Sequence, residues 1–167
     1  MDFRATADGW FHFAGQACRC ALGRGGVRLD KREGDGATPV GSFALRRVHY
    51  RADRLAAAPL TALPLQPIQP NDGWCDDPAH PDYNRPVALP HPARTEVMWR
   101  DDGLYDVVCA LGYNDDPPVA GLGSAIFLHV ARPTWAPTEG CVALALPDLL
   151  TVLALAGPES RLEITAS

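Results

Sequence analysis

The chain is built from short apolar runs that are separated by clusters of glycine, proline, asparagine and aspartate. Short runs of this kind, bounded by turn-forming residues, are typical of β-strands. We predict strands over residues 9–13, 17–22, 26–29, 43–50, 104–112, 124–130, 141–144 and 161–165. Because helical patterns do not alternate with these runs, the sequence favours a mainly β fold over repeated strand–helix units.

One segment has the periodicity of a helix. Pro147 suits the first helical position because its φ is fixed, and apolar residues from Leu149 to Ala156 then recur at helical spacing. Gly157 and Pro158 end the pattern. We predict one helix in the C-terminal region, over about 147–156, packed against the sheet that carries Cys141.

Residues 51–92 have no regular pattern. Nine of the 16 prolines lie between positions 59 and 92, which interrupts any strand or helix. We therefore predict a long Pro-rich loop over about 51–92. Its aromatic and polar residues, among them Trp74, Tyr83 and Arg85, favour a lid or cleft wall, and a partly ordered surface excursion is the alternative.

Composition narrows the class of protein. At 167 residues and 18.0 kDa, the whole chain, 1–167, is expected to form a single domain. A net charge of -5 argues against a nucleic-acid binder. No apolar stretch is long enough for a membrane span, and the first residues are too polar for a secretory signal, so we see no export route. The sequence leaves the oligomeric state open.

The cysteines do not form a disulfide or metal pattern. Their number, five, leaves at least one thiol unpaired within the chain. Cys18 and Cys20 lack the spacing of a zinc knuckle, and the five histidines lack the HExxH spacing, so we expect no metal and no cofactor. Cys75 is a rival nucleophile, but no histidine lies in a comparably ordered segment.

Cys141 carries the clearest chemistry. It lies in the segment Thr-Glu-Gly-Cys-Val, twelve residues after His129, which ends an apolar run. An imidazole can take the proton of a thiol and stabilise the thiolate, which is the reactive form. Gly140 lets a carbonyl substrate approach the backbone N–H groups, which face a developing oxyanion. The alternative is a buried core cysteine with an incidental histidine.

Three motifs together point to a known family. Residues 31–43 read Lys-Arg-Glu-Gly-Asp-Gly-Ala-Thr-Pro-Val-Gly-Ser-Phe, and they are followed by His129 and then by Thr-x-Gly-Cys-Val at 138–142. This order resembles the catalytic domain of the L,D-transpeptidases of bacterial peptidoglycan, the YkuD-type domain. The similarity extends over almost the whole chain.

The resemblance implies a β-sandwich-like catalytic fold and a reaction. Cys141 would be the nucleophile that attacks a stem-peptide carbonyl, His129 the general base, and the Gly140 backbone part of the oxyanion site. The thioester would pass to an amine of a second stem, so the partners would be peptidoglycan stem peptides and muropeptides. The resemblance also implies inhibition by carbapenems and a location in the periplasm or cell envelope.

The chain departs from the family pattern at two positions near the nucleophile. Ala143 stands where an arginine is common, and Val130 follows His129 where glycine is common. We interpret the chain as a distinct branch with a reshaped cleft. The crosslink therefore stays open between diaminopimelate–diaminopimelate and L-alanine–diaminopimelate.

Arginines are the candidate ligands for stem carboxylates. Of the 15 basic residues, 14 are arginine, whose planar fork suits carboxylates. We select Arg85, Arg100 and Arg132, together with Tyr83 and Trp74 in the long loop, as candidate substrate contacts. Each arginine has the alternative of a surface or structural ion pair.

Two other classes of function stay open. A domain of this kind can act as an L,D-carboxypeptidase or amidase-type hydrolase, in which case an added amine is not incorporated. It can also be a non-catalytic wall-binding module, in which case Cys141→Ala retains the full biological effect.

Overall fold

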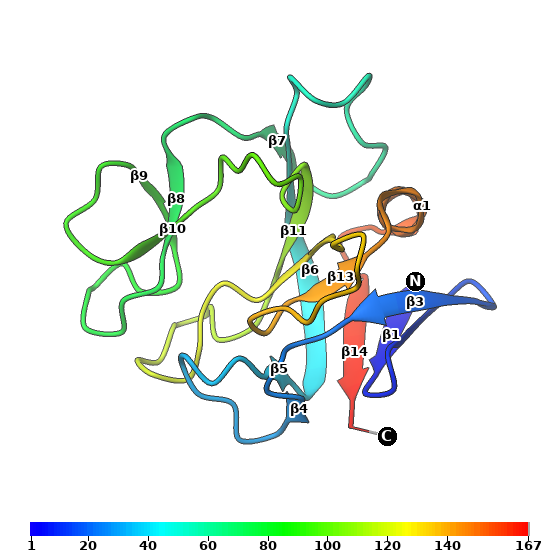
Figure 1. Ribbon diagram of the computed structural model, residues 1–167, viewed down its shortest axis with the longest axis horizontal. Coiled ribbons are helices and arrows are strands. Elements are labelled where there is room, and N and C mark those ends of the chain that lie inside the picture. Colours follow the sequence, from blue (N-terminus) through cyan, green and yellow to red (C-terminus); the bar gives the residue numbers. More distant parts are fainter. Residues whose placement is uncertain (167) are drawn as a thin grey trace.

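The main sheet of the protein is closed on itself. The computed structural model describes residues 1–166, and its main sheet has nine strands in the order β11-β12-β13-β3-β2-β1-β14-β6-β7 (Figure 1). An additional pairing of β11, at one end of this order, with β6, the strand next to the other end, closes the sheet into a barrel-like form, and β7 pairs with β6. The strands are β1 (Asp2–Thr6), β2 (Trp10–Phe13), β3 (Gln16–Ala21), β6 (Gly41–Tyr50), β7 (Leu65–Pro67), β11 (Val107–Leu111), β12 (Phe127–Val130), β13 (Val142–Leu144) and β14 (Arg161–Thr165).

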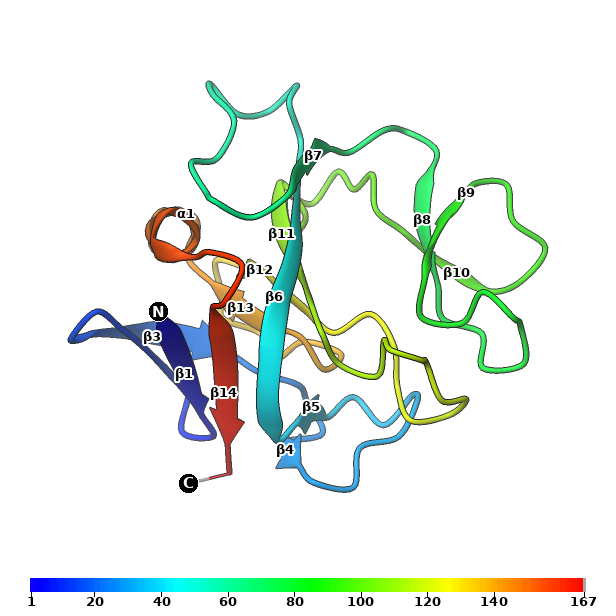
Figure 2. The same ribbon diagram turned by 180° about the vertical axis from the view of Figure 1, so that it is seen from behind.

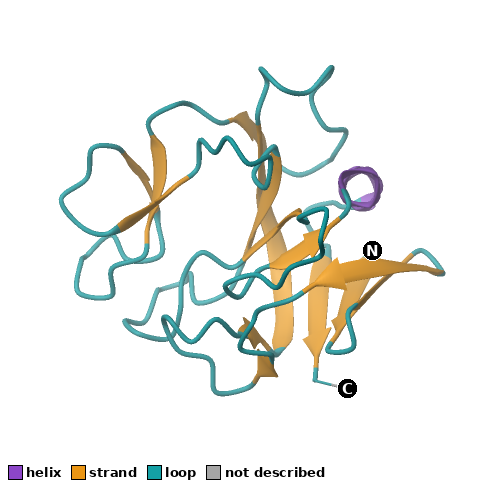
Figure 3. Cartoon of the chain, in the orientation of Figure 1, coloured by secondary structure: helices purple, strands orange, loops and turns teal. Residues whose placement is uncertain are grey.

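Two smaller sheets and one helix complete the fold. The small sheet has the order β10 (Thr95–Val97), β8 (Asp72–Cys75) and β9 (Pro86–Ala88), and β4 (Val27–Arg28) pairs with β5 (Thr38–Pro39). Helix α1 (Leu146–Leu155) and the small sheet lie on opposite sides of β6 and β11 in both views (Figures 1 and 2). Strands and long loops make up most of the rest (Figure 3). No helix in residues 1–166 has the length and hydropathy to cross a bilayer.

The strands and helix expected from the apolar pattern are confirmed, with shifted ends. Each predicted strand overlaps an observed one, and the helix begins at Leu146 rather than Pro147. Strand β12 begins at Phe127 rather than at position 124 because Ala125 has a φ of 53°, which is incompatible with a strand. The pattern missed β1, although its alternation of buried and exposed residues is that of a half-buried strand.

The prediction that residues 51–92 contain no regular element is wrong. This segment contributes β7, β8 and β9, and β8 pairs with both β9 and β10. The strands have only three or four residues each. Pro67 is the last residue of β7 and Pro86 is the first of β9, and β8 contains no proline. The segment is therefore an ordered subdomain that packs on the main sheet.

Alternation along β12 and β13 places the site between two cores. Leu128, Val142 and Leu144 face the larger core, which includes α1. Phe127 and Cys141 face a second cluster with Met98, Tyr105 and the small sheet's Trp74. Successive side chains point to opposite faces of a strand, so His129 and Ala143 share the face of Cys141.

Candidate active site

Cys141 and His129 open on one cavity. Strands β12 and β13 are parallel neighbours, with His129 opposite Ala143 and Leu128 opposite Val142. This register places Cys141 beside Phe127, two positions from His129 on the adjacent strand. Both side chains line a cavity of about 480 Å³, with 8% of Cys141 and 4% of His129 exposed to solvent.

His129 is held in one tautomer by the backbone. Its Nδ1 lies 2.8 Å from the carbonyl oxygen of Val130, which can only accept, so Nδ1 carries the proton. Nε2 is then the free base. The Tyr105 ring packs on the imidazole in a T-shaped arrangement, with 5.4 Å between the ring centroids. Burial lowers the pKa of His129 to about 4, so the ring is neutral at pH 7.

The Cys141 thiol is protonated in the resting site. Burial raises its pKa to about 12, and Glu96, when it is ionised, also raises it. Two backbone groups hold the sulfur: Sγ donates to the Ala125 oxygen at 3.3 Å, and the Phe127 N–H donates to Sγ at 3.4 Å. The resting pair is therefore a neutral thiol and a neutral imidazole, which suits general-base activation.

The turn before Cys141 requires glycine. Gly140 has a φ of 133°, and a Cβ on it would lie 2.8 Å from the Ala37 oxygen. The Thr138 hydroxyl donates to the Cys141 oxygen at 2.7 Å and accepts from the Gly140 N–H at 3.1 Å. The Gly140 N–H expected to face an oxyanion is thus bonded within the turn, and the hydroxyl of Thr138, the first residue of the Thr-x-Gly-Cys-Val motif, shapes that turn.

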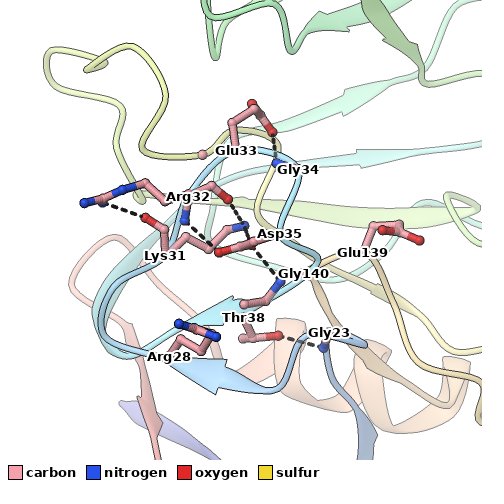
Figure 4. A network of polar contacts seen from close by, with 12 residues as sticks. Gly23, Arg28, Lys31, Arg32, Glu33, Gly34, Asp35, Thr38, Glu139 and Gly140 are labelled. Carbon is pink, nitrogen blue, oxygen red and sulfur yellow. Dashed lines mark hydrogen bonds and ion pairs between the residues drawn. The ribbon is translucent and has the colours of Figure 1, made fainter.

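The motif at residues 31–43 forms the loop that supports this turn (Figure 4). Lys31, the only lysine, is 4% exposed and pairs with Asp35 at 2.6 Å, four residues along the chain. Asp35 also accepts from the Arg32 and Ala37 N–H groups. The loop therefore folds around one carboxylate and presents the Ala37 carbonyl to Gly140.

A second support holds Ala125, whose carbonyl meets the thiol. Asn84 is 6% exposed, and its Oδ1 accepts from the Ala125 N–H at 3.0 Å and from Trp74 Nε1 at 2.9 Å. Its Nδ2 donates to the Tyr113 and Asn114 oxygens. All of the hydrogen-bonding capacity of this amide is used. Asn84 therefore fixes the backbone beside Cys141, a role that nothing in the local sequence indicates.

The expected substrate contacts separate into two groups. Arg100 and Arg132 line the cavity with Cys141. The carboxylate of Asp102 accepts from Arg100 at 3.0 Å and lies 3.8 Å from Arg132. The Arg100 hydrogen bond is the main reason that the pKa of Asp102 is lowered to about 2. Asp102 thus lies between the two guanidinium groups, and both Nε and Nη2 of Arg100 donate to it.

Tyr83, Trp74 and Arg85 lie elsewhere. The Tyr83 hydroxyl donates to Glu33 at 2.8 Å, and the side chain is buried. Trp74 and Arg85 line a second cavity, of about 500 Å³, and the Trp74 ring packs edge-on against Phe127 at 5.0 Å. The structure does not bring these three residues to the cavity of Cys141, so we leave them out of the proposed substrate contacts.

The departure at position 143 widens the cavity. Ala143 lines it directly opposite His129. A longer side chain there would fill this space, and Arg100 and Arg132 supply positive charge from other elements. The rival Cys75 is fully buried in β8 and does not line the cavity, which removes it from consideration as the nucleophile.

Three residues outside the cavity have the composition of a metal site. The ligand atoms of His80, Asp82 and His91 lie within 4.8 Å of one another. Both imidazoles, however, accept a backbone N–H at Nδ1, at 3.1 and 3.2 Å, and His91 Nε2 meets Asp82 Oδ2 at 3.0 Å. Internal hydrogen bonds account for these atoms, and we assign no metal to them.

Comparison with known proteins identifies the family. The family model for the YkuD L,D-transpeptidase catalytic domain matches residues 10–164. Among solved structures, the chain is similar to the helical cell shape determining protein Pgp2 from Campylobacter jejuni, with 13% identity and a TM-score of 0.47, over 99% of this chain and 47% of that chain. The chain thus spans about half the length of that protein. The comparison with curated proteins gives no match. Because the family model matches nearly the whole chain, this protein belongs to the YkuD family of L,D-transpeptidase catalytic domains.

Proposed function

We propose that this protein is a peptidoglycan L,D-transpeptidase with Cys141 as nucleophile and His129 as general base. The observation that carries the proposal is the opening of both side chains on one cavity, with Nε2 of His129 free because Nδ1 binds the Val130 oxygen. Family membership supports the same chemistry.

The reaction has two halves. His129 Nε2 takes the proton of Cys141, and the sulfur attacks the carbonyl of a stem-peptide bond. His129 then protonates the leaving nitrogen, and a thioester remains on the sulfur. In the second half, an amine of a neighbouring stem attacks the thioester, and the thiol is restored. Covalent catalysis divides one difficult displacement into two easier steps.

The cavity wall suggests how the substrate is held. Arg132 is suited to a carboxylate of the stem, because a guanidinium group binds a carboxylate in two-point fashion, and Arg100 would bind one by exchanging Asp102 for the substrate. The oxyanion would lie near the N–H groups of Gly140 and Cys141, and the Gly140 N–H would exchange Thr138 for the substrate. We place the action of the protein at the cell envelope, as for its family, and specifically in the periplasm.

Product analysis tests the proposal. The purified protein is incubated with sacculi that bear tetrapeptide stems, and the muropeptides are identified by mass spectrometry. We expect dimers joined after diaminopimelate or after L-alanine from the wild type and none from Cys141→Ala. Trimmed monomers without dimers would instead indicate the hydrolase, and dimers from Cys141→Ala would refute the proposal.

A further inference from the structure

Glu96 is a partly buried carboxyl group that the Cys141 and His129 chemistry does not use. It lies on β10, opposite Trp74 of β8, and its side chain lines the cavity with Cys141 and His129. The Tyr105 hydroxyl donates to Glu96 Oε1, and the same ring packs on His129. Glu96 therefore faces the reacting groups from the small sheet. Tyr105, which donates to Glu96, also contacts the base His129.

Glu96 also differs from the other carboxylates of the cavity wall in its partners. The carboxylates that line the cavity are those of Glu33, Asp76, Glu96 and Glu139. Arginines pair with Asp76 at 3.1 Å and with Glu139 at 2.8 Å. Two hydroxyl groups and a backbone N–H donate to Glu33. Within residues 1–166, Glu96 has the single hydrogen bond from Tyr105 and no ion pair.

The proposed reaction includes one proton transfer that His129 does not perform. An acceptor amine with a pKa of about 10 enters as an ammonium ion at pH 7, and it must lose a proton before it can attack. The donor amine must gain one after it leaves. His129 moves the thiol proton to the leaving nitrogen, and later moves a proton of the attacking nitrogen back to the sulfur. It returns to its starting state, and the ammonium proton has not been moved.

We propose that Glu96 is a second catalytic residue, which carries this proton between the two half-reactions; the inference rests on the proposed transpeptidase function. After the carbon–nitrogen bond of the donor breaks, Glu96–COOH protonates the departing amine and becomes a carboxylate. The carboxylate then takes a proton from the entering ammonium ion. The free amine forms the new carbon–nitrogen bond as the carbon–sulfur bond breaks. One ammonium ion enters and one leaves, so protons and charge balance.

The electrostatics of the cavity are consistent with this cycle. Burial raises the pKa of Glu96, which favours the neutral acid in the resting site. A neutral Glu96 does not oppose formation of the Cys141 thiolate, whereas an ionised one raises the thiol pKa. Hydration of the ammonium ion favours proton transfer from Glu96 as the donor amine leaves for solvent, and loss of that hydration favours transfer from nitrogen to the carboxylate as the acceptor enters.

The choice of acceptor amine tests the role of Glu96. Glu96→Gln keeps the shape of the side chain but cannot take a proton. With a tetrapeptide donor and a D-amino acid acceptor at pH 7, we expect its transfer rate to fall by about 100-fold or more. Hydroxylamine is neutral at pH 7 and needs no base before attack. Transfer to hydroxylamine should therefore be far less affected, and a residue with only a structural role would lower both rates together.

Controls separate this inference from the proposed function. Glu159→Gln, on an exposed loop, should behave as the wild type, and Glu96→Asp should recover part of the D-amino acid transfer. Adduct formation on Cys141 by a carbapenem, which releases no amine, verifies that each variant is folded. Equal loss with both acceptors, or no loss with the D-amino acid, overturns the role of Glu96. A wild type that transfers to neither acceptor overturns the proposed function instead.

Discussion

The protonation state of Cys141 gives the sharpest test of the site's electrostatics. Iodoacetamide reacts with the thiolate and not with the thiol, so its rate reports the ionised fraction. Burial raises the pKa of Cys141 from 9.0 to about 12. Three pKa units correspond to about 4 kcal/mol favouring the neutral form. At pH 7 the thiolate fraction should be about 10⁻⁵, against about 10⁻² for an ordinary thiol.

The assay follows alkylation of Cys141 by peptide mass mapping as the pH is changed. We expect the rate to rise about tenfold per pH unit from pH 7 to 10, with no plateau. Mapping is required because the other four cysteines are also free thiols. His129→Asn should leave this profile unchanged, because the imidazole does not ionise the thiol in the resting site. The same variant should abolish acylation by a carbapenem, because the imidazole takes the thiol proton only during the reaction. A plateau with a midpoint near pH 6 would show a resting thiolate–imidazolium pair and refute the reasoning.

Three further variants test the supports of the site. Gly140→Ala places a Cβ 2.8 Å from a backbone oxygen at a φ of 133°, and we expect a loss of about 1–3 kcal/mol in a urea unfolding curve. Asn84→Ala leaves the Ala125 N–H without its acceptor, so its free energy of unfolding should fall by about 1–3 kcal/mol in the same assay and its acylation by a carbapenem should slow. Asn84→Asp keeps that acceptor and should lose less stability. Asp102→Asn removes a carboxylate whose pKa is lowered from 3.8 to about 2, mainly by Arg100. Because Asp102 is partly exposed, we expect this carboxylate to add about 1 kcal/mol to the free energy of unfolding. The contribution is present above pH 3.8 and is lost as the pH falls through 2, so the stabilities of wild type and variant should converge near pH 2.

The turnover of the proposed enzyme should also depend on pH through His129. Its pKa is lowered to about 4, chiefly by burial, and only the neutral ring can accept a proton. Carbapenem acylation should therefore be lost as the pH falls through about 4 and should show no step near 6.5. The measurement is the rate of adduct formation by intact mass, and a step near 6.5 would contradict the burial of the base.

The parts of the fold that repeat locally could be predicted from the sequence. Alternating or continuous apolar runs identified the strands that carry His129 and Cys141, and Pro147 together with the helical spacing after it identified α1. The small sheet could not be predicted, because its strands are only three or four residues long and lie among prolines. Their stability comes from pairing with one another and from packing on Phe127, which local patterns do not reveal.

The site divides in the same way. Cys141, His129 and Gly140 lie within one short segment that contains recognisable motifs, so all three could be predicted from the sequence. Glu96 reaches the site beside Tyr105 because its small-sheet strand packs there, and Asn84 reaches it through Ala125, 41 residues along the chain. Tyr83 and Arg85 flank Asn84 and were expected to contact substrate. In the structure, Asn84 and Tyr83 instead accept hydrogen bonds from the backbone N–H groups of Ala125 and Gly123, in the segment that holds the Cys141 thiol.

Direct detection of the thioester tests the central claim. The protein is mixed with a tetrapeptide donor and no acceptor, quenched in acid, and mapped by peptide mass spectrometry. We predict a mass increase, equal to the acyl part of the donor, on the peptide that contains Cys141, and its disappearance when a D-amino acid is added. Transfer to the D-amino acid with an unmodified Cys141, or with the acyl group on another residue, would contradict the account.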